Sequence, residues 1–237
     1  MAVDGRRSDL AVRTGSAIVM LVVAGLALWF GGLAFQLFVI LLAAMVYWEW
    51  GGLVLRFPDG NGGKVIWLLA GIAYVGFAVS FILQMDRAER LILIGLVIAT
   101  DIGAYFSGRT IGGPKIAPSI SPSKTWAGLG GGMLAAGLLM AGTLVLGLYG
   151  LSGDPEQPAA DPWLEPSWIV LAFAIGACVA ILAQIGDFFE SWMKRRAGVK
   201  DSGTLIPGHG GVFDRVDGLL FPAIILGLVY TLTGIPT

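Results

Sequence analysis

The hydrophobic pattern of the chain consists of seven long apolar stretches joined by polar connections. Each stretch is close to the roughly 20 residues that a helix needs to cross the hydrocarbon core of a bilayer. The pattern therefore predicts seven membrane-spanning helices, at about 14–31, 33–50, 65–85, 90–108, 128–150, 167–188 and 216–233. The first two are separated only by Gly31 and Gly32, which predicts a tight hairpin or a pair of half-buried segments.

The composition agrees with a membrane protein. Of the 237 residues, 56% are hydrophobic and 13% are charged, against about 25% charged residues in an average soluble domain. The 36 glycines are about twice the usual share and favour close helix packing in a bilayer. A net charge of −1 argues against nucleic acid as a partner, and the single cysteine, Cys178, excludes an intrachain disulfide. We therefore predict an all-α polytopic membrane protein.

Lysine and arginine are distributed unevenly between the two sides of the predicted membrane. If the N-terminus is cytoplasmic, thirteen of these bases lie on the cytoplasmic side, and only Arg87 and Arg90 lie on the other. The 151–166 loop, on the outer side, has four acids and no base. Because cytoplasmic loops are enriched in Lys and Arg, the N-terminus is predicted to be cytoplasmic. A cleaved signal peptide is the alternative for the first segment, but the apolar run resumes directly after Gly32.

Four acidic residues lie within or at the ends of the apolar stretches. They are Glu49, Asp101, Asp187 and Glu190. An ionisable side chain at membrane depth costs about 2.5–3.5 kcal/mol on insertion scales, so each needs a partner or a functional reason. For Glu49, within the aromatic stretch Tyr47–Trp50, we favour an interfacial position or an ion pair with a nearby arginine. The surroundings of the other three favour a function.

The predicted cytoplasmic loop from Thr110 to Trp126 is dense in glycine, proline and hydroxyl residues. Its last part includes Ser121 and Lys124. Hydroxyls, free backbone amides and spaced cations together are suited to binding a polyphosphate. An ordinary interfacial loop has a similar composition, and the spacing of a Walker P-loop is missing.

The densest set of chemical groups lies in residues 184–218. Asp187, Glu190 and Ser191 are spaced i, i+3 and i+4 at the end of the sixth stretch, and so lie on one helix face. Basic and glycine-rich segments follow, and a second acidic pair opens the last stretch: Lys194-Arg195-Arg196, Lys200-Asp201, Pro207-Gly208-His209-Gly210-Gly211 and Asp214-Arg215-Val216-Asp217.

Carboxylates surrounded by bases at a membrane surface are suited to metal-assisted phosphate chemistry. Mg²⁺ commonly binds a few carboxylates and completes its coordination with water and substrate phosphates, while Lys and Arg offset the charge that develops in phosphoryl or nucleotidyl transfer. A basic interfacial loop with salt-bridged acids is the alternative. It leaves unexplained the acids entering a span and the single histidine between glycines. For His209 itself, metal ligation and a structural role both stay open, and with no second histidine a zinc site is not expected.

These residues resemble the signature of the phosphatidate cytidylyltransferase (CDP-diacylglycerol synthase) family. The match is carried by Ser191, Lys194-Arg195, Lys200-Asp201, Gly203, Ile206-Pro207, His209-Gly210-Gly211 and Asp214-Arg215-Val216-Asp217. Two further family blocks are similar to Gly186-Asp187 with Glu190-Ser191, and to Ser121-Pro122 with Lys124-Thr125. The chain departs from the family pattern at Ala127, where an acid is usual.

The resemblance implies transfer of the CMP moiety of CTP to phosphatidate, giving CDP-diacylglycerol and pyrophosphate for phospholipid biosynthesis. It also implies Mg²⁺ as cofactor, with a second cation left open, and a homodimer. The expected location is a bacterial-type inner (cytoplasmic) membrane, with the active site facing the cytoplasm. Residues 1–237 would then form a single integral-membrane catalytic domain with its signature region at 184–218.

The resemblance and the local chemistry together assign roles to individual residues. We expect Asp187 and Asp214 to hold the metal, with Asp217 in its first or second coordination shell. The other expected catalytic residues are Lys194, Lys200, His209 and Arg215. The expected substrate-binding residues are Ser121, Lys124, Ser191, Arg195, Gly210 and Gly211.

Two other classes of protein are kept as alternatives. A CTP-dependent polyprenol or dolichol kinase would transfer the γ-phosphoryl group of CTP instead of CMP. A transporter would also place acids and bases within spans, but typically with interrupted helices in symmetric halves, whereas the charges here cluster on one side and no internal symmetry is evident. A CDP-alcohol phosphotransferase is disfavoured because its Asp-Gly…Ala-Arg…Gly…Asp…Asp pattern is missing from the sequence.

Overall fold

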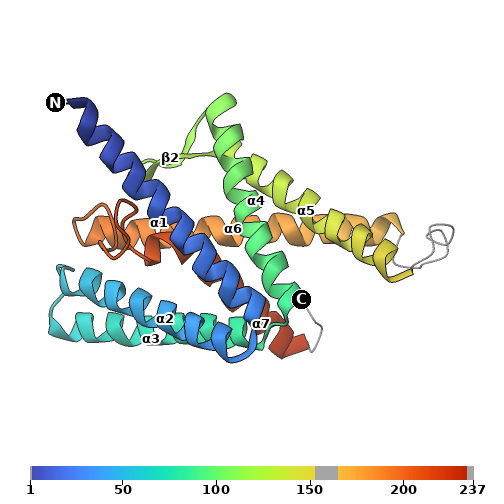
Figure 1. Ribbon diagram of the computed structural model, residues 1–237, viewed down its shortest axis with the longest axis horizontal. Helices are drawn as coiled ribbons and strands as arrows, with labels where there is room; N and C mark the ends of the chain where they lie inside the picture. Colours follow the sequence, from blue (N-terminus) through green and yellow to red (C-terminus); the bar gives the residue numbers. More distant parts are fainter. Residues whose placement is uncertain (1, 153–164, 234–237) are drawn as a thin grey trace. The chain divides into compact units, whose positions relative to one another are not determined.

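The computed structural model describes residues 2–152 and 165–233, and the side chains of residues 12–147 and 165–232. In chain order (Figure 1), the elements are α1 (Ala2–Phe30), α2 (Gly32–Leu55), α3 (Asn61–Gln84), α4 (Arg87–Thr110), β1 (Lys115–Ala117), β2 (Ser121–Thr125), α5 (Trp126–Ser152), α6 (Pro166–Arg196) and α7 (Phe213–Thr233). Within these residues, seven helices are long and apolar enough to cross a membrane. The predicted seven spans and the all-α polytopic class are confirmed.

Some helices extend past the apolar stretches that predicted them. Helix α6 was expected to end near residue 188, yet it continues for about two turns to Arg196. An i, i+4 ion pair supports this extension, with Lys194 Nζ 2.6 Å from Glu190 Oε2. Helix α2 likewise continues to Leu55. A bilayer sets the minimum length of a span, but packing and ion pairs decide where the helix ends.

The predicted loop between Thr110 and Trp126 contains a small β-hairpin. Strands β1 and β2 pair antiparallel, with Lys115 opposite Thr125 and Ala117 opposite Ser121. Gly112 and Gly113 precede β1 with φ angles of 68° and 92°, which glycine adopts without the strain that a side chain would bring. The hairpin fixes the direction in which β2 presents its side chains.

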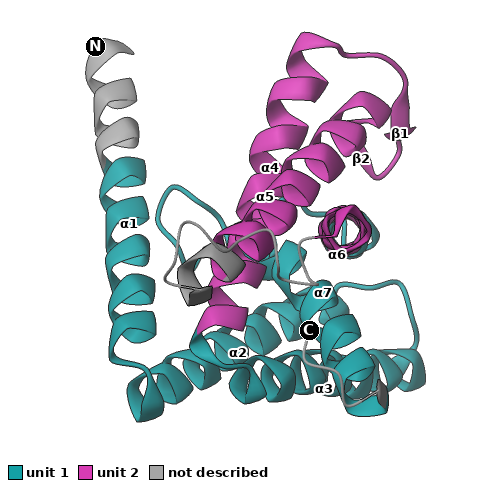
Figure 2. Ribbon diagram, turned by 90° about the vertical axis from the view of Figure 1, so that its right-hand side faces the viewer, with its two compact units in different colours: residues 1–87, 189–237 teal, residues 88–188 magenta. Residues whose placement is uncertain are grey.

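The chain divides into two compact units (Figure 2). Unit 1 comprises residues 1–87 and 189–237, and unit 2 comprises residues 88–188. The boundary at 188/189 falls inside α6, so the signature region 184–218 contributes residues to both units.

The core of unit 1 is built around Trp50 of α2. This side chain is 1% exposed, its ring packs against Tyr74, Phe189 and Phe213 at centroid distances of 5.7–5.9 Å, and its Nε1–H donates to the carbonyl of Trp67 at 2.9 Å. A buried indole commonly satisfies its N–H in this way. The aromatic cluster joins α2 and α3 to the end of α6 and the start of α7.

Helices α1 and α2 are joined by a sharp break at two glycines. Gly31 and Gly32 have φ angles of 61° and 48°, in the left-handed region that L-residues rarely adopt. On the two sides of the break, Ala27 of α1 and Phe35 and Val39 of α2 form a small buried cluster. The first two spans are therefore separate helices that meet at Gly31 and Gly32, as the sequence predicted.

Unit 2 is held together by glycines at its helix contacts. A Cβ added at Gly103 of α4 would lie 2.4 Å from the carbonyl oxygen of Gly131 in α5, and one added at Gly131 would lie 1.9 Å from Ser107 Oγ. Helices α5 and α6 meet in the same way, since a Cβ at Gly176 would lie 2.4 Å from the carbonyl oxygen of Ala136. The predicted use of glycine for close helix packing is thus confirmed in this unit.

Candidate active site

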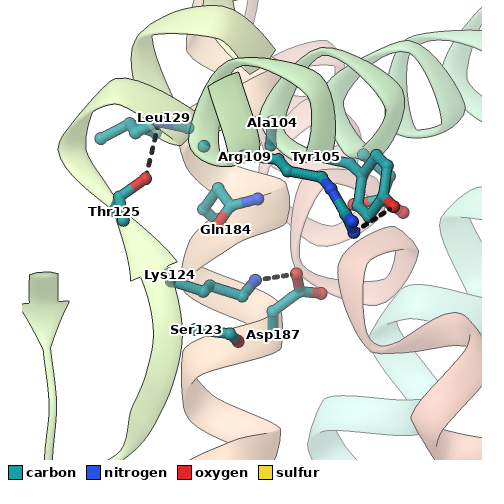
Figure 3. Close-up of a pocket in the computed structure, with 12 residues that line it drawn as sticks. Ala104, Tyr105, Arg109, Ser123, Lys124, Thr125, Leu129, Gln184 and Asp187 are labelled. Atoms are coloured by element: carbon teal, nitrogen blue, oxygen red, sulfur yellow. Dashed lines mark hydrogen bonds and ion pairs between the residues drawn. The ribbon is translucent and has the colours of Figure 1, made fainter. Parts of the chain in front are cut away.

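Unit 2 contains a polar cavity of about 380 Å³ (Figure 3). Residues of α4, of β2, of the first turn of α5 and of α6 form its wall. They are Asp101, Ala104, Tyr105, Gly108, Arg109, Ser123, Lys124, Thr125, Gly128, Leu129, Gln184 and Asp187. Two bases and two acids thus line one cavity, and this arrangement offers both cations and hard oxygen ligands to a charged substrate.

The centre of this cavity is an ion pair between Lys124 and Asp187. Lys124 Nζ contacts Asp187 Oδ2 directly, and the two side chains are only 20% and 19% exposed. Nζ also lies 5.3 Å from the ring centroid of Phe188, a cation–π distance. The β-hairpin carries Lys124 to α6, so two residues that the sequence analysis assigned to different parts of the site lie together.

The hairpin continues directly into α5 through a cap. Thr125 is buried, and its Oγ1 accepts the N–H of Gly128 at 3.0 Å, which satisfies one of the free amides at the start of a helix. Of the serines in β2, Ser123 lines the cavity. Ser121, the serine predicted to bind substrate, is buried at the start of the strand.

Three polar cavity residues, Tyr105, Arg109 and Gln184, were not assigned to the site from the sequence, whereas Asp101 was expected to be functional without a stated role. Asp101, Tyr105 and Arg109 are spaced i, i+4 and i+8 on α4, and Gln184 lies one turn before Asp187 on α6. Arg109 Nη1 donates to Tyr105 Oη at 3.1 Å. The helical spacing was a usable signal, because polar residues repeating every three or four positions in an apolar helix share one face.

Unit 1 contains a second cluster, centred on Lys194. Its Nζ lies 2.6 Å from Glu190 Oε2 and 2.7 Å from Asp214 Oδ1. Glu190 is 0% exposed, and its Oε1 accepts no hydrogen bond within the described part of the chain. Two carboxylates around one ammonium group leave an excess of negative charge, and an uncompensated buried charge is unfavourable without a further cation or proton.

Asp214 holds the loop that precedes it. Its Oδ2 accepts the N–H of Ser202 at 3.0 Å and the N–H of Gly211 at 2.8 Å, and it lies 2.9 Å from Ser202 Oγ. Gly210, which was predicted to bind substrate, has a φ of 83°, and this left-handed geometry brings the next amide toward Asp214. The predicted residues Lys194, Gly211 and Asp214 are therefore in direct contact.

The remaining predicted residues of unit 1 lie around this loop. Arg215 Nη2 donates to the carbonyl of His209 at 2.6 Å, and His209 Nδ1 lies 3.0 Å from Ser16 Oγ of α1. The side chains of Arg195, Lys200 and Arg215 are exposed, whereas those of Ser191 and Asp217 are half-buried. Lys200 and Arg215 are thus open to an anion, while His209 is fixed by its neighbours.

A preformed metal cage is not found among the residues that the structure describes, since no three His, Cys, Asp or Glu side chains are grouped to hold an ion. Mg²⁺ does not need such a cage, because it commonly binds one or two carboxylates and completes its shell with water and phosphate oxygens. The orphaned Oε1 of Glu190 and the two carboxylates around Lys194 are compensated either by a nearby cation or by a proton on the Glu190–Asp214 pair. The donor set is therefore compatible with Mg²⁺.

The seven apolar helices define an integral membrane protein, and the paired acids and bases are suited to phosphate chemistry. A profile of the cytidylyltransferase family matches residues 60–233. The chain belongs to this family.

Curated relatives are similar over almost the whole chain. A protein named phosphatidate cytidylyltransferase from Brucella suis is 34% identical over an alignment of 273 positions, which covers 93% of this chain and 93% of the relative. Proteins of the same name from Rickettsia bellii and Rickettsia typhi are 34% and 31% identical, and the alignments cover 95% and 94% of this chain and 93% and 92% of the relatives.

Proposed function

We propose that this protein transfers the CMP moiety of CTP to phosphatidate, forming CDP-diacylglycerol and pyrophosphate. The observation that carries the proposal is the similarity, over more than nine-tenths of the chain, to proteins named phosphatidate cytidylyltransferase. The polar cavity with Arg109 and Lys124 supports it, because both substrates are phosphate anions.

In this reaction a phosphate oxygen of phosphatidate attacks the α-phosphorus of CTP. A new P–O bond forms, the bond between the α-phosphorus and its bridging oxygen breaks, and pyrophosphate leaves with the electron pair. Phosphatidate is already ionised at neutral pH, so its oxygen needs positioning rather than a strong general base. The main barrier is the approach of two anions, which fixed cations lower.

Each cluster supplies part of this chemistry in the proposal. Lys124 binds phosphate oxygens of CTP in the cavity of unit 2, where Ser123 of the same strand also lines the wall, whereas the predicted Ser121 is buried and does not line this cavity. Phosphate groups of the two substrates are bound by further bases: Lys194, Arg195, Lys200 and Arg215. His209 orients a phosphate or the leaving pyrophosphate, while Ser191, Gly210 and Gly211 shape the surface against which the substrates lie.

The proposed carboxylate ligands for Mg²⁺ are Asp187 in unit 2 and, in unit 1, Asp214 with Asp217 in the first or second coordination shell, each set considered within its own unit. Bound Mg²⁺ would neutralise charge on the polyphosphate and stabilise the leaving group. The protein's own contribution is to hold these carboxylates in place.

The experiment that tests this function uses the purified protein in detergent with CTP, phosphatidate and Mg²⁺. CTP labelled at the α-phosphate should yield labelled CDP-lipid together with an equal amount of pyrophosphate, and omission of any component should stop both. Label appearing in lipid only from γ-labelled CTP would identify a lipid kinase instead. No turnover with either class of lipid in folded protein would favour the transporter alternative.

We also propose that the site faces the cytoplasm of a bacterial-type inner membrane. The support is the excess of bases in the connections on one side of the spans. In a Cys178→Ser background, Thr204→Cys should react with an impermeant maleimide only in inside-out vesicles, and Ala88→Cys only in right-side-out vesicles. Both positions are exposed. The reverse labelling pattern would contradict this orientation.

A homodimer is the proposed assembly, supported by the family resemblance. Light scattering of the detergent-solubilised protein, corrected for bound detergent, should give twice the chain mass of 24.9 kDa. A protein mass equal to one chain at all concentrations that support turnover would refute the dimer.

A further inference from the structure

Glu49 of α2 lies in an environment that the sequence analysis did not anticipate. It was expected at the membrane interface or paired with an arginine, and this expectation is wrong. The side chain is 3% exposed, and its carboxylate accepts the N–H of Val212 at 3.0 Å, the N–H of Phe213 at 2.8 Å and the hydroxyl of Ser202 at 3.0 Å. All three donors are uncharged and belong to the signature loop or to the start of α7.

The two backbone donors are the amide of Val212, directly before α7, and the amide of Phe213, the first residue of α7. The first N–H groups of a helix have no partner within that helix, and a carboxylate at this end is favoured by the helix dipole. Residues close in sequence usually provide such a cap. Here the cap comes from α2, more than 160 positions away along the chain. Glu49 therefore holds the start of α7 against α2 within unit 1.

The third donor connects Glu49 to Asp214. Ser202 Oγ lies 3.0 Å from Glu49 Oε2 and 2.9 Å from Asp214 Oδ2, and Ser202 N donates to the same Asp214 oxygen at 3.0 Å. The Ser202 hydroxyl therefore lies between the two carboxylates and, with its single proton, donates to one of them at a time, while its backbone N–H donates to Asp214. Asp214 is also the second residue of α7, so Glu49 constrains its position both through Ser202 and through the amide of Phe213.

Two glycines of the signature leave room for this carboxylate. A Cβ added at Gly203 would lie 2.3 Å from Glu49 Oε1, and one added at Gly211 would lie 2.4 Å from Glu49 Oε2. Neither glycine has a positive φ, so backbone conformation does not require glycine at either position. Glycine is required at Gly203 by the space that the Glu49 side chain occupies, and at Gly211 by the space that Glu49 and Ser202 Oγ occupy.

We propose that Glu49 is a positioning residue of the active site, whose buried carboxylate holds the loop 202–213 and thereby orients Asp214 for catalysis. The inference rests on the proposed function for its catalytic consequence. The anchoring of the loop can be tested without turnover.

The first test compares Glu49→Gln with Tyr47→Phe, a control on the same helix whose hydroxyl makes a single 3.4 Å contact with the carbonyl of Leu68. Glu49→Gln keeps the shape but places an NH₂ group against N–H donors. We expect faster hydrogen–deuterium exchange in peptides covering 202–213, and a kcat lower by about 10- to 100-fold, the effect of a lost buried charge-assisted hydrogen bond, with little change in KM for CTP. Tyr47→Phe should leave all three quantities near wild type.

The second test is a cycle between Gly203→Ala and Glu49→Ala. Gly203→Ala alone should reduce kcat, because its methyl group displaces the carboxylate, whereas in the Glu49→Ala background it should add no further loss. Gly52→Ala, at a position on α2 with nothing within 4 Å of an added Cβ, is the matched control and should be neutral. Glu49→Asp should retain more activity than Glu49→Gln, since it keeps the charge.

The outcomes separate the proposal from its alternatives. A kcat loss in Glu49→Gln that only follows a loss of folded protein would reduce Glu49 to a structural role and overturn the proposal. Unchanged exchange in 202–213, or additive losses in the Gly203 cycle, would also overturn it. If the wild-type protein forms no CDP-lipid, the proposed function fails, while the exchange experiment still decides whether Glu49 anchors the loop.

Discussion

Asp214→Asn is expected to abolish CMP transfer while the protein stays folded and inserted in the membrane. The substitution removes the negative charge but keeps the shape, so Lys194 or one of the three groups that contact Oδ2 would meet an NH₂ group. We expect a loss of at least about 10³-fold in turnover, at the upper end of what removing one electrostatic group costs an enzyme. The measurement is CDP-lipid formation over a range of Mg²⁺ concentrations, with thermal unfolding in detergent as the check on folding.

Asp59→Asn is the matched control for this variant. Asp59 also pairs with a base in unit 1, with Arg196 Nη2 2.7 Å from Oδ1, but both side chains are partly exposed. Such pairs contribute less than about 1 kcal/mol, so Asp59→Asn should turn over at nearly the wild-type rate. Wild-type activity of Asp214→Asn at every Mg²⁺ concentration would mean that Asp214 does not bind the metal.

Lys124→Ala is expected to act on CTP binding rather than on the chemical step. Lys124 is the base at the centre of the unit 2 cavity, and its charge is directed to Asp187. Hydrogen bonds to charged groups contribute about 1.5–3 kcal/mol, so removing one to a polyphosphate should raise the apparent KM for CTP by about 10- to 100-fold. Steady-state kinetics with CTP varied at saturating phosphatidate and Mg²⁺ would measure this.

Lys115→Ala is the control for Lys124→Ala, because it removes the same charge from the same hairpin. Lys115 is exposed on β1 and contacts only the carbonyl of Ser123, at 3.4 Å, among the contacts described for it. Its removal should leave the KM for CTP near the wild-type value. If Lys124→Ala also left the KM for CTP unchanged, the β-hairpin would not contribute to CTP binding.

The site residues that could be predicted from the sequence are those that lie close together along one helix or one motif. Asp187, Glu190 and Lys194 follow each other at helical spacing on α6, and the resemblance identified Asp214. By contrast, the pairing of Lys124 with Asp187 joins residues 63 positions apart. Helical spacing could have indicated Arg109 and Gln184, but which face of a helix borders a cavity depends on how neighbouring helices pack.

Neither the β-hairpin nor the role of Glu49 could be predicted from local sequence patterns. Strands β1 and β2 have three and five residues, too few to show a periodicity, and their pairing is what makes them strands. Glu49 stands in an aromatic, apolar segment that is typical of an interface. Its partners are amides and a hydroxyl more than 150 positions away, which no local pattern can reveal.

The sequence by itself determined that the chain crosses a membrane seven times and belongs with membrane enzymes of phosphate chemistry. Span length and residue composition are set by the bilayer, and short motifs keep their spacing along one helix or loop. The tertiary structure alone decided which distant groups meet: Lys124 with Asp187, and Glu49 with the loop that carries Asp214. Such contacts depend on close packing of helices, and the positions where glycine leaves room for it are fixed only once the helices are in contact.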